Sequence, residues 1–98
     1  MSLPVIVRPA AESNSQEAYA ALATVQAGLG NRFSTQLGNV LERIERMPEM
    51  YGVVWQDVRA VRLKRFRYVF FYVVFSDRVE VLAVMHGACD PSAWQSRL

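Results

Sequence analysis

The chain has 98 residues, 52% of them hydrophobic and 11% aromatic, which excludes an intrinsically disordered chain and predicts one domain, residues 1–98. Its formal net charge of +2 is low for a dedicated nucleic-acid-binding protein, and its only cysteine, Cys89, excludes an internal disulfide. The longest apolar run, Tyr68 to Phe75, is shorter than the roughly 20 residues of a membrane-spanning helix, and the N-terminus lacks a secretory signal. We therefore expect a soluble cytoplasmic protein with no membrane partner.

The N-terminal part of the chain predicts one strand and a first helix. Residues 5–7 are β-branched and precede Arg8-Pro9, which is typical of a short strand that ends at proline. Ser13 or Asn14 is expected to cap the helix, because Gln16 or Glu17 follows three residues later. The apolar residues that recur at helical spacing are Ala18, Leu22, Val25 and Leu29. Residues 28–31, Gly-Leu-Gly-Asn, end this helix, because they tolerate left-handed geometry.

A second helix is indicated by the clearest periodicity in the chain. Its apolar stripe, which we expect to lie in the core, consists of Phe33, Leu37, Val40, Leu41, Ile44 and Met47. Pro48 ends the helix, and Gly38 in its middle would allow another backbone to come close. Residues 49–57 are predicted to form a loop that is too apolar to be solvated. This loop either folds over the sheet edge or contributes to a partner surface.

The C-terminal half predicts three strands and a short helix. Residues 59–65 alternate, with Val61 and Leu63 on one face and Arg62 on the other. Residues 68–75 are apolar on both faces, as in a central strand, and a short turn joins them to residues 79–86 in an antiparallel hairpin. A terminal helix follows, with Asp90 as its cap, Pro91 at its first position and Trp94 packing back onto the domain.

These elements predict an α+β fold in the order β-α-α-β-β-β, with a short C-terminal helix. Two adjacent helices followed by a meander of strands imply a helical hairpin packed on one face of a small, mostly antiparallel sheet.

Basic residues are concentrated in one segment of nine residues that contains no acid: Arg59, Arg62, Lys64, Arg65 and Arg67. The rest of the chain carries a formal charge of −3. Charge concentrated in this way attracts phosphates or an acidic partner. The alternative is a solvated edge strand whose charges prevent aggregation.

The order of elements and several motifs together resemble the RelE/ParE superfamily of toxins from bacterial type II toxin–antitoxin systems, which includes plasmid stabilisation proteins. The matching segments are GLGNRF at 28–33, VRLKRF at 61–66, YVFFY at 68–72, VLAVMHG at 81–87, and Asp90-Pro91 with Trp94. The chain departs from the family pattern in three places. Arg67 stands where a proline is common, Ala88 and Cys89 stand where basic residues are common, and Ala21-Leu22 replace an aromatic pair.

The resemblance implies one of two toxic activities. One branch of the superfamily inhibits DNA gyrase, and the other cleaves mRNA on the ribosome. No tyrosine follows His86 at the position that ribonuclease members commonly use, which favours a gyrase inhibitor or a non-toxic binding module that retains the fold. A metal-independent ribonuclease would use Arg62 and Arg65 to stabilise the charged phosphorane and His86 as acid or base. Because side chains alternate along a strand, His86 is expected on one face with Glu80, Leu82 and Val84. The alternative to a catalytic role is that His86 is a structural hydrogen-bonding residue there.

The resemblance also implies partners. A cognate antitoxin is expected to wrap its C-terminal segment across the helices and sheet. This partner would be acidic and amphipathic, and would lie in an apolar groove beside the basic segment. The target is DNA gyrase, or alternatively the ribosome and mRNA. Residues expected to bind the target or its phosphates are Arg59, Arg62, Lys64, Arg65 and Arg67. We expect no metal and no cofactor, and either a homodimer or a toxin–antitoxin hetero-oligomer.

Overall fold

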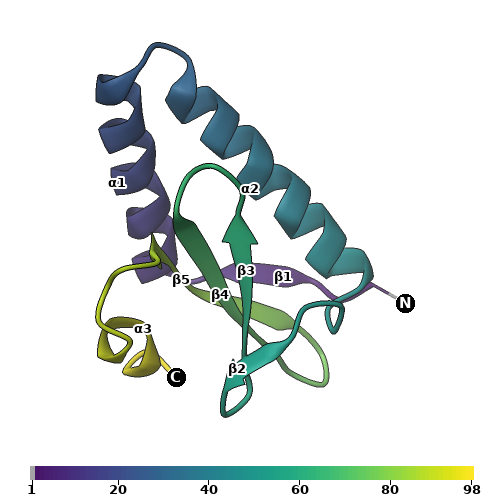
Figure 1. Ribbon diagram of the computed structural model, residues 1–98. Helices are drawn as coiled ribbons and strands as arrows, with labels where there is room; N and C mark the ends of the chain where they lie inside the picture. Colours follow the sequence, from purple (N-terminus) through teal and green to yellow (C-terminus); the bar gives the residue numbers. More distant parts are fainter. Residues whose placement is uncertain (1) are drawn as a thin grey trace.

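A computed structural model describes residues 2–98, in which five strands form one sheet in the order β1-β5-β4-β3-β2 (Figure 1). The strands are β1 (Val5–Val7), β2 (Val53–Trp55), β3 (Val58–Leu63), β4 (Tyr68–Val74) and β5 (Val79–His86). β1 runs parallel to β5, and the other three pairs are antiparallel. The predicted α+β fold with a mostly antiparallel sheet is therefore confirmed. The apolar segment 49–57 is only partly a loop, because its residues 53–55 extend the sheet as the edge strand β2.

Two helices, α1 (Pro9–Val25) and α2 (Leu29–Arg46), form a hairpin over one face of the sheet, and the short α3 (Ser92–Gln95) lies on the opposite face (Figure 1). Within residues 2–98, no helix combines the length and the hydropathy needed to cross a membrane. α1 begins at Pro9, before both expected caps, and its N-cap is Arg8, because proline has the φ angle that suits the first helical turn. Asn14 is therefore inside the helix, where its Oδ1 accepts a hydrogen bond from the Val84 amide.

The connection between the two helices is shorter than the sequence predicts. Gly28 has a φ of +82°, and α2 begins directly after it, so Leu29 belongs to the second helix and not to the first. Close backbone approach occurs at Gly30, where an added Cβ would lie 3.0 Å from the Tyr19 carbonyl oxygen. The expectation for Gly38 is wrong, since a Cβ built there would meet no atom within 4 Å beyond its neighbouring residues and the backbone of its own helix.

Hydrophobic cores lie on both faces of the sheet, as the apolar sequence of β4 predicts. Under the helical hairpin, the stripe residues Phe33, Val40 and Ile44 are buried, whereas Met47 at the end of the stripe is 61% exposed. On the opposite face, the Trp94 ring stacks on Phe71 with centroids 4.2 Å apart. The predicted packing of Trp94 is thus confirmed. The expected cap is wrong by one residue, because α3 begins at Ser92 and its N-cap is Pro91, although the Ser92 amide does donate a hydrogen bond to the Asp90 carboxylate.

A β-bulge in β5 changes which residues share a face. Phe71 pairs with Ala83 and Tyr72 pairs with Val81, so Leu82 is an extra residue on β5. Leu82 packs in the core on the α3 side, and alternation after the bulge returns Val84 to the helical side. Of the three residues expected on the same face as His86, only Val84 is there. The expected position of His86 beside Glu80 and Leu82 is wrong, because the bulge shifts the alternation by one residue.

Candidate functional site

The turn between β3 and β4 places two arginines in left-handed backbone conformations. Arg65 has a φ of 74° and Arg67 a φ of 58°. Between them, Phe66 is buried and its ring meets that of Phe33 edge-on at 5.6 Å. The amide of Phe66 donates to the carbonyl oxygen of Leu63. The turn is thus anchored by an aromatic side chain while its arginines are exposed. A proline at residue 67 would require a φ near −65°, so the turn in this conformation has no place for the proline that is common in the family.

Four of the five predicted cations line one open cleft of about 650 Å³, which lies between this turn and the end of β5. We call it the cationic cleft, and its basic residues are Arg62, Lys64, Arg65 and Arg67. His86 also lines it, and no aspartate or glutamate does. The ion pairs found among residues 2–98 all lie elsewhere, between Arg8 or Arg78 and the carboxylates of Asp77 and Glu80. The cleft therefore presents positive charge without an internal counter-ion.

Arg59, the fifth predicted cation, is separated from the cationic cleft. In β3 it pairs with Tyr72 on the face that the helices cover. Its guanidinium donates hydrogen bonds to the carbonyl oxygens of Tyr51 at 2.6 Å and Glu49 at 3.2 Å. The Tyr72 hydroxyl donates to the carbonyl oxygen of Pro48 at 2.8 Å, and burial raises the pKa of Tyr72 to about 12. Arg59 and Tyr72 thus fix the segment that follows α2.

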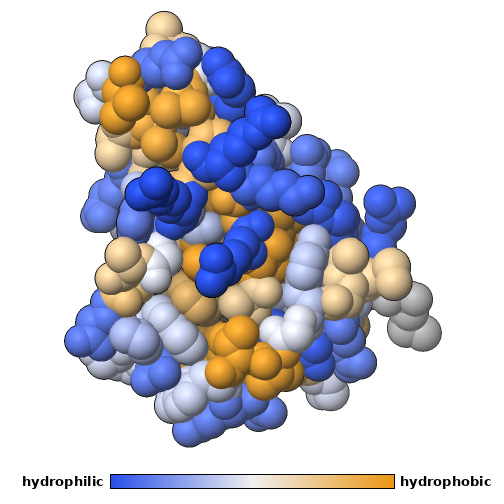
Figure 2. All heavy atoms as spheres, in the orientation of Figure 1, coloured by the Kyte–Doolittle hydropathy of each residue, from blue (hydrophilic) through white to orange (hydrophobic). Residues whose placement is uncertain are grey.

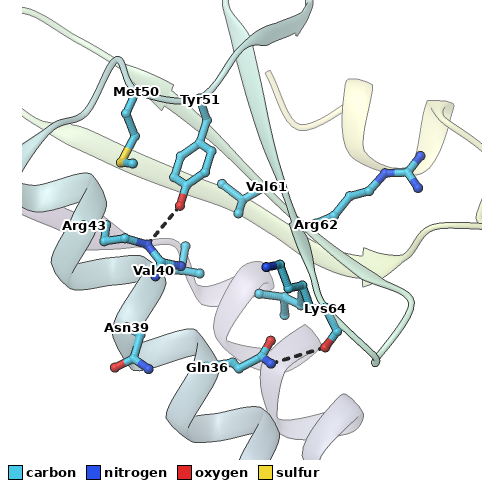
Figure 3. A pocket seen from close by; sticks show the side chains of 10 residues that line it. Gln36, Asn39, Val40, Arg43, Met50, Tyr51, Val61, Arg62 and Lys64 are labelled. Carbon is cyan, nitrogen blue, oxygen red and sulfur yellow. Dashed lines mark hydrogen bonds between the residues drawn. The ribbon is translucent and has the colours of Figure 1, made fainter.

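The three proposed ribonuclease residues, Arg62, Arg65 and His86, all line the cationic cleft, but Arg62 and His86 reach it from opposite faces of the sheet. Arg62 pairs with Val69 on the α3 side, whereas His86 pairs with Tyr68 on the helical side. Figure 3 shows Arg62 extending away from α2. The Nδ1 atom of His86 accepts a hydrogen bond from the Ala88 amide at 3.1 Å, so the neutral ring carries its proton on Nε2. In this tautomer Nε2–H could donate a proton as a general acid, but it has no lone pair with which to act as a general base.

A second depression, of about 540 Å³, lies between α2 and β3 (Figure 3). We call it the α2–β3 groove. Val40 and Val61 line it, and Gln36 Nε2 donates to the Lys64 carbonyl oxygen across it at 3.2 Å. At its other end Arg43 Nε donates to the Tyr51 hydroxyl at 2.9 Å. In Figure 2, hydrophobic surface is visible between hydrophilic side chains where α2 faces β3.

An exposed methionine pair continues the α2–β3 groove beyond the end of α2. Met47 is 61% exposed and Met50 is 45% exposed, and both line a shallow depression with Arg43 and Arg46. We call these four residues the methionine patch. Periodicity alone assigns Met47 to the core and the two arginines to solvent. The signal that could have indicated the patch is the apolar segment 49–57 directly after the helix.

Comparison with known proteins gives consistent results. Residues 5–91 match the family model described as ParE toxin of type II toxin–antitoxin system, parDE. The chain is 29% identical over 59 residues to proteins named Toxin ParE2 from two strains of Mycobacterium tuberculosis. That alignment covers 60% of this chain and 56% of each relative, so the chain spans little more than half the length of these relatives.

A solved structure described as the chromosomal ParDE TA system from P. aeruginosa has a similar fold. Its TM-score is 0.72 at 11% sequence identity, and the match covers 87% of this chain and 96% of that one. At this level of identity the similarity concerns the fold alone.

Proposed function

The chain belongs to the ParE toxin family of type II toxin–antitoxin systems, and we propose that it inhibits DNA gyrase and that a cognate antitoxin neutralises it. The family match extends over nearly the whole chain, which supports an activity exerted by this domain itself. Inhibition by binding needs a surface of complementary charge and shape, and it needs no general base.

The observation that carries the choice of gyrase over mRNA cleavage is the hydrogen bond between His86 and the Ala88 amide. Metal-independent RNA cleavage requires a base to activate the 2′-hydroxyl. His86 Nδ1 is occupied by the amide, and Nε2 carries the proton of the neutral ring. Arg62, one of the two stabilising cations of that mechanism, projects from the opposite face of the sheet to His86. The cationic cleft is therefore better suited to binding than to cutting.

The antitoxin is proposed to bind in the α2–β3 groove and on the methionine patch. Val40, Val61 and the exposed methionines offer apolar contacts, and Arg43 and Arg46 lie beside them. An amphipathic segment with carboxylates on one side would bury its apolar side chains here and bring its charges to these arginines. Segments that become ordered on binding combine apolar anchors with charge in this way.

The test is a supercoiling assay with purified gyrase, relaxed plasmid and the purified protein. We expect inhibition of supercoiling, which the co-encoded antitoxin reverses. The variant Arg43→Glu should still inhibit gyrase but should need a higher antitoxin concentration for reversal, because it places a like charge in the antitoxin site. Arg32→Glu, which changes an exposed arginine of α2 outside the groove, is the matched control.

Two results would contradict the proposal. Folded protein that leaves gyrase active but cleaves ribosome-bound mRNA would be a ribonuclease. Folded protein that does neither, and does not arrest growth when expressed, would be a binding module that retains the fold.

A further inference from the structure

We propose that the cationic cleft binds the phosphate backbone of duplex DNA, so that the toxin contacts the DNA held by gyrase as well as the enzyme. This inference rests on the proposed function and adds a second partner to it. The proposed ligand is the phosphate backbone of a double helix, which the cleft would recognise by its charge and without contacts to the bases.

The first support is the electrostatic state of the cleft. Arg62, Lys64, Arg65 and Arg67 are all exposed and line it without a carboxylate among the lining residues. By contrast, Arg8 and Arg78 in the described part of the chain bond to Glu80. A phosphate that enters the cleft therefore displaces no internal partner. Each phosphate neutralised releases condensed counter-ions from the DNA, which favours binding.

The second support is the rigidity of the turn that carries the cations. Left-handed φ angles at Arg65 and Arg67 are unfavourable, and such conformations concentrate at binding sites. Phe66 holds the turn from beneath through its contact with Phe33. The Arg67 carbonyl oxygen also accepts a hydrogen bond of 2.7 Å from the Gly87 amide, which ties the turn to the end of β5. The backbone that carries these cations is thus already ordered, so binding costs less conformational entropy than it would for a flexible loop.

The third support distinguishes a duplex from a single strand. Binding of single-stranded nucleic acid depends on aromatic rings that stack with unpaired bases. Within residues 2–98 the rings that line the cleft are those of Tyr68 and His86. The Tyr68 ring meets Phe33 at 5.4 Å and His86 at 5.7 Å, both edge-on, and Tyr68 is half-buried, so it is a poor stacking platform. The cleft thus offers four cations and a single exposed ring, that of His86, and this excess of charge over stacking surface suits a duplex backbone.

The arrangement of the charges favours an extended ligand over one small anion. Arg62 projects from the α3 side of the sheet, whereas His86 lies on the helical side. Arg65 and Arg67 belong to the turn that follows β3. These groups therefore enter the cleft from both faces of the sheet and from the turn at its end. Successive phosphates along a backbone would match this distribution.

Fluorescence anisotropy with a labelled DNA duplex of arbitrary sequence tests the inference directly. We expect binding that weakens with salt, with a slope of roughly 0.9 in log K against log[salt] for each phosphate neutralised. Arg65→Asn, which keeps a residue that tolerates left-handed φ, should lower affinity several-fold and reduce the slope by about one phosphate. Arg62→Gln should do the same from a regular strand position. Arg32→Gln, at an exposed cation outside the cleft and outside the proposed antitoxin site, should change neither quantity.

Three results would overturn the inference. The protein could fail to bind the duplex at low salt, the cleft variants could bind it as tightly as the unchanged protein, or the protein could bind single-stranded RNA of the same length more tightly than the duplex. The last would point to an mRNA ligand. The supercoiling assay separates this inference from the proposed function. A protein that inhibits gyrase without binding DNA retains the proposed function and lacks the DNA site, whereas a protein that binds DNA without inhibiting gyrase shows the reverse.

Discussion

The guanidinium of Arg59 lies 2.6 Å from the carbonyl oxygen of Tyr51, so one cation of the basic segment acts within the protein instead of at its surface. The same guanidinium reaches the Glu49 carbonyl oxygen at 3.2 Å. These bonds hold the segment that forms one wall of the α2–β3 groove. Arg59 therefore positions a binding surface that it does not itself line.

Arg59→Ala should lower the free energy of unfolding by about 1–3 kcal/mol, because two carbonyl oxygens lose a charged donor. Urea denaturation measures this change. Arg62→Ala, on an exposed side chain of the same strand, is the control and should change stability by less than about 0.5 kcal/mol. Equal stability of the two variants would contradict the structural role of Arg59.

Tyr72 should make stability depend on pH at the alkaline end of the range. Its pKa is about 12 in the folded protein because the side chain is buried, and the ordinary value is near 10. Between pH 10 and 12 the unfolded chain loses this proton while the folded chain keeps it, so stability falls as pH rises.

Denaturant titrations from pH 9 to 12 check the Tyr72 prediction. Tyr72→Phe should be less stable than the wild type at pH 9, because the Pro48 carbonyl oxygen loses its donor. The difference between the two proteins should shrink as pH rises through the window. A difference that stays constant to pH 12 would show that Tyr72 does not titrate as expected.

Two glycines of α2 should respond to alanine with opposite signs. Gly38→Ala should stabilise the protein by about 0.5–1 kcal/mol, because the site is open and alanine favours the helix. Gly30→Ala should destabilise it, because the new Cβ would lie 3.0 Å from the Tyr19 backbone oxygen. Thermal unfolding of both variants measures the shifts, and the same sign for both would contradict the close helix packing described at Gly30.

Arg97 should be important for the bulge in β5. One guanidinium nitrogen donates to the Leu82 carbonyl oxygen at 2.9 Å and to Asn14 Oδ1 at 2.6 Å. Arg97→Ala removes the donor from a half-buried carbonyl, and we expect a loss of about 1–3 kcal/mol in stability. Hydrogen exchange should accelerate at the Val84 amide, which shares Asn14 as its acceptor. Unchanged exchange there would show that the bulge is stable without Arg97.

Periodicity predicted most of the fold. The stripe from Phe33 to Ile44 and the apolar strand β4 each have one arrangement that buries their side chains, so their sequences determine them. Two features could not be predicted. The bulge at Leu82 has no glycine or proline to indicate it, and the three-residue strand β2 is too short to show alternation.

The candidate site was predictable in part. A run of cations without acids indicates a charged surface, and four of the five do line one cleft. Sequence could not show that Arg59 turns inward, because that depends on carbonyl oxygens of a loop eight and ten residues away. Nor could it show the left-handed turn, since arginine has no preference for positive φ. The role of these residues in binding stays a prediction.

The pairing of β1 with β5 has a consequence for synthesis of the protein. Val5 pairs with Val79, and Val7 with Val81, so the first strand has no partner until β5 has left the ribosome. Contacts between such distant parts of a chain form late and slow folding. The helical hairpin is complete much earlier, but the sheet that it covers is not. A nascent chain interrupted before β5 would therefore expose strand edges and apolar helix faces, a state prone to aggregation and degradation.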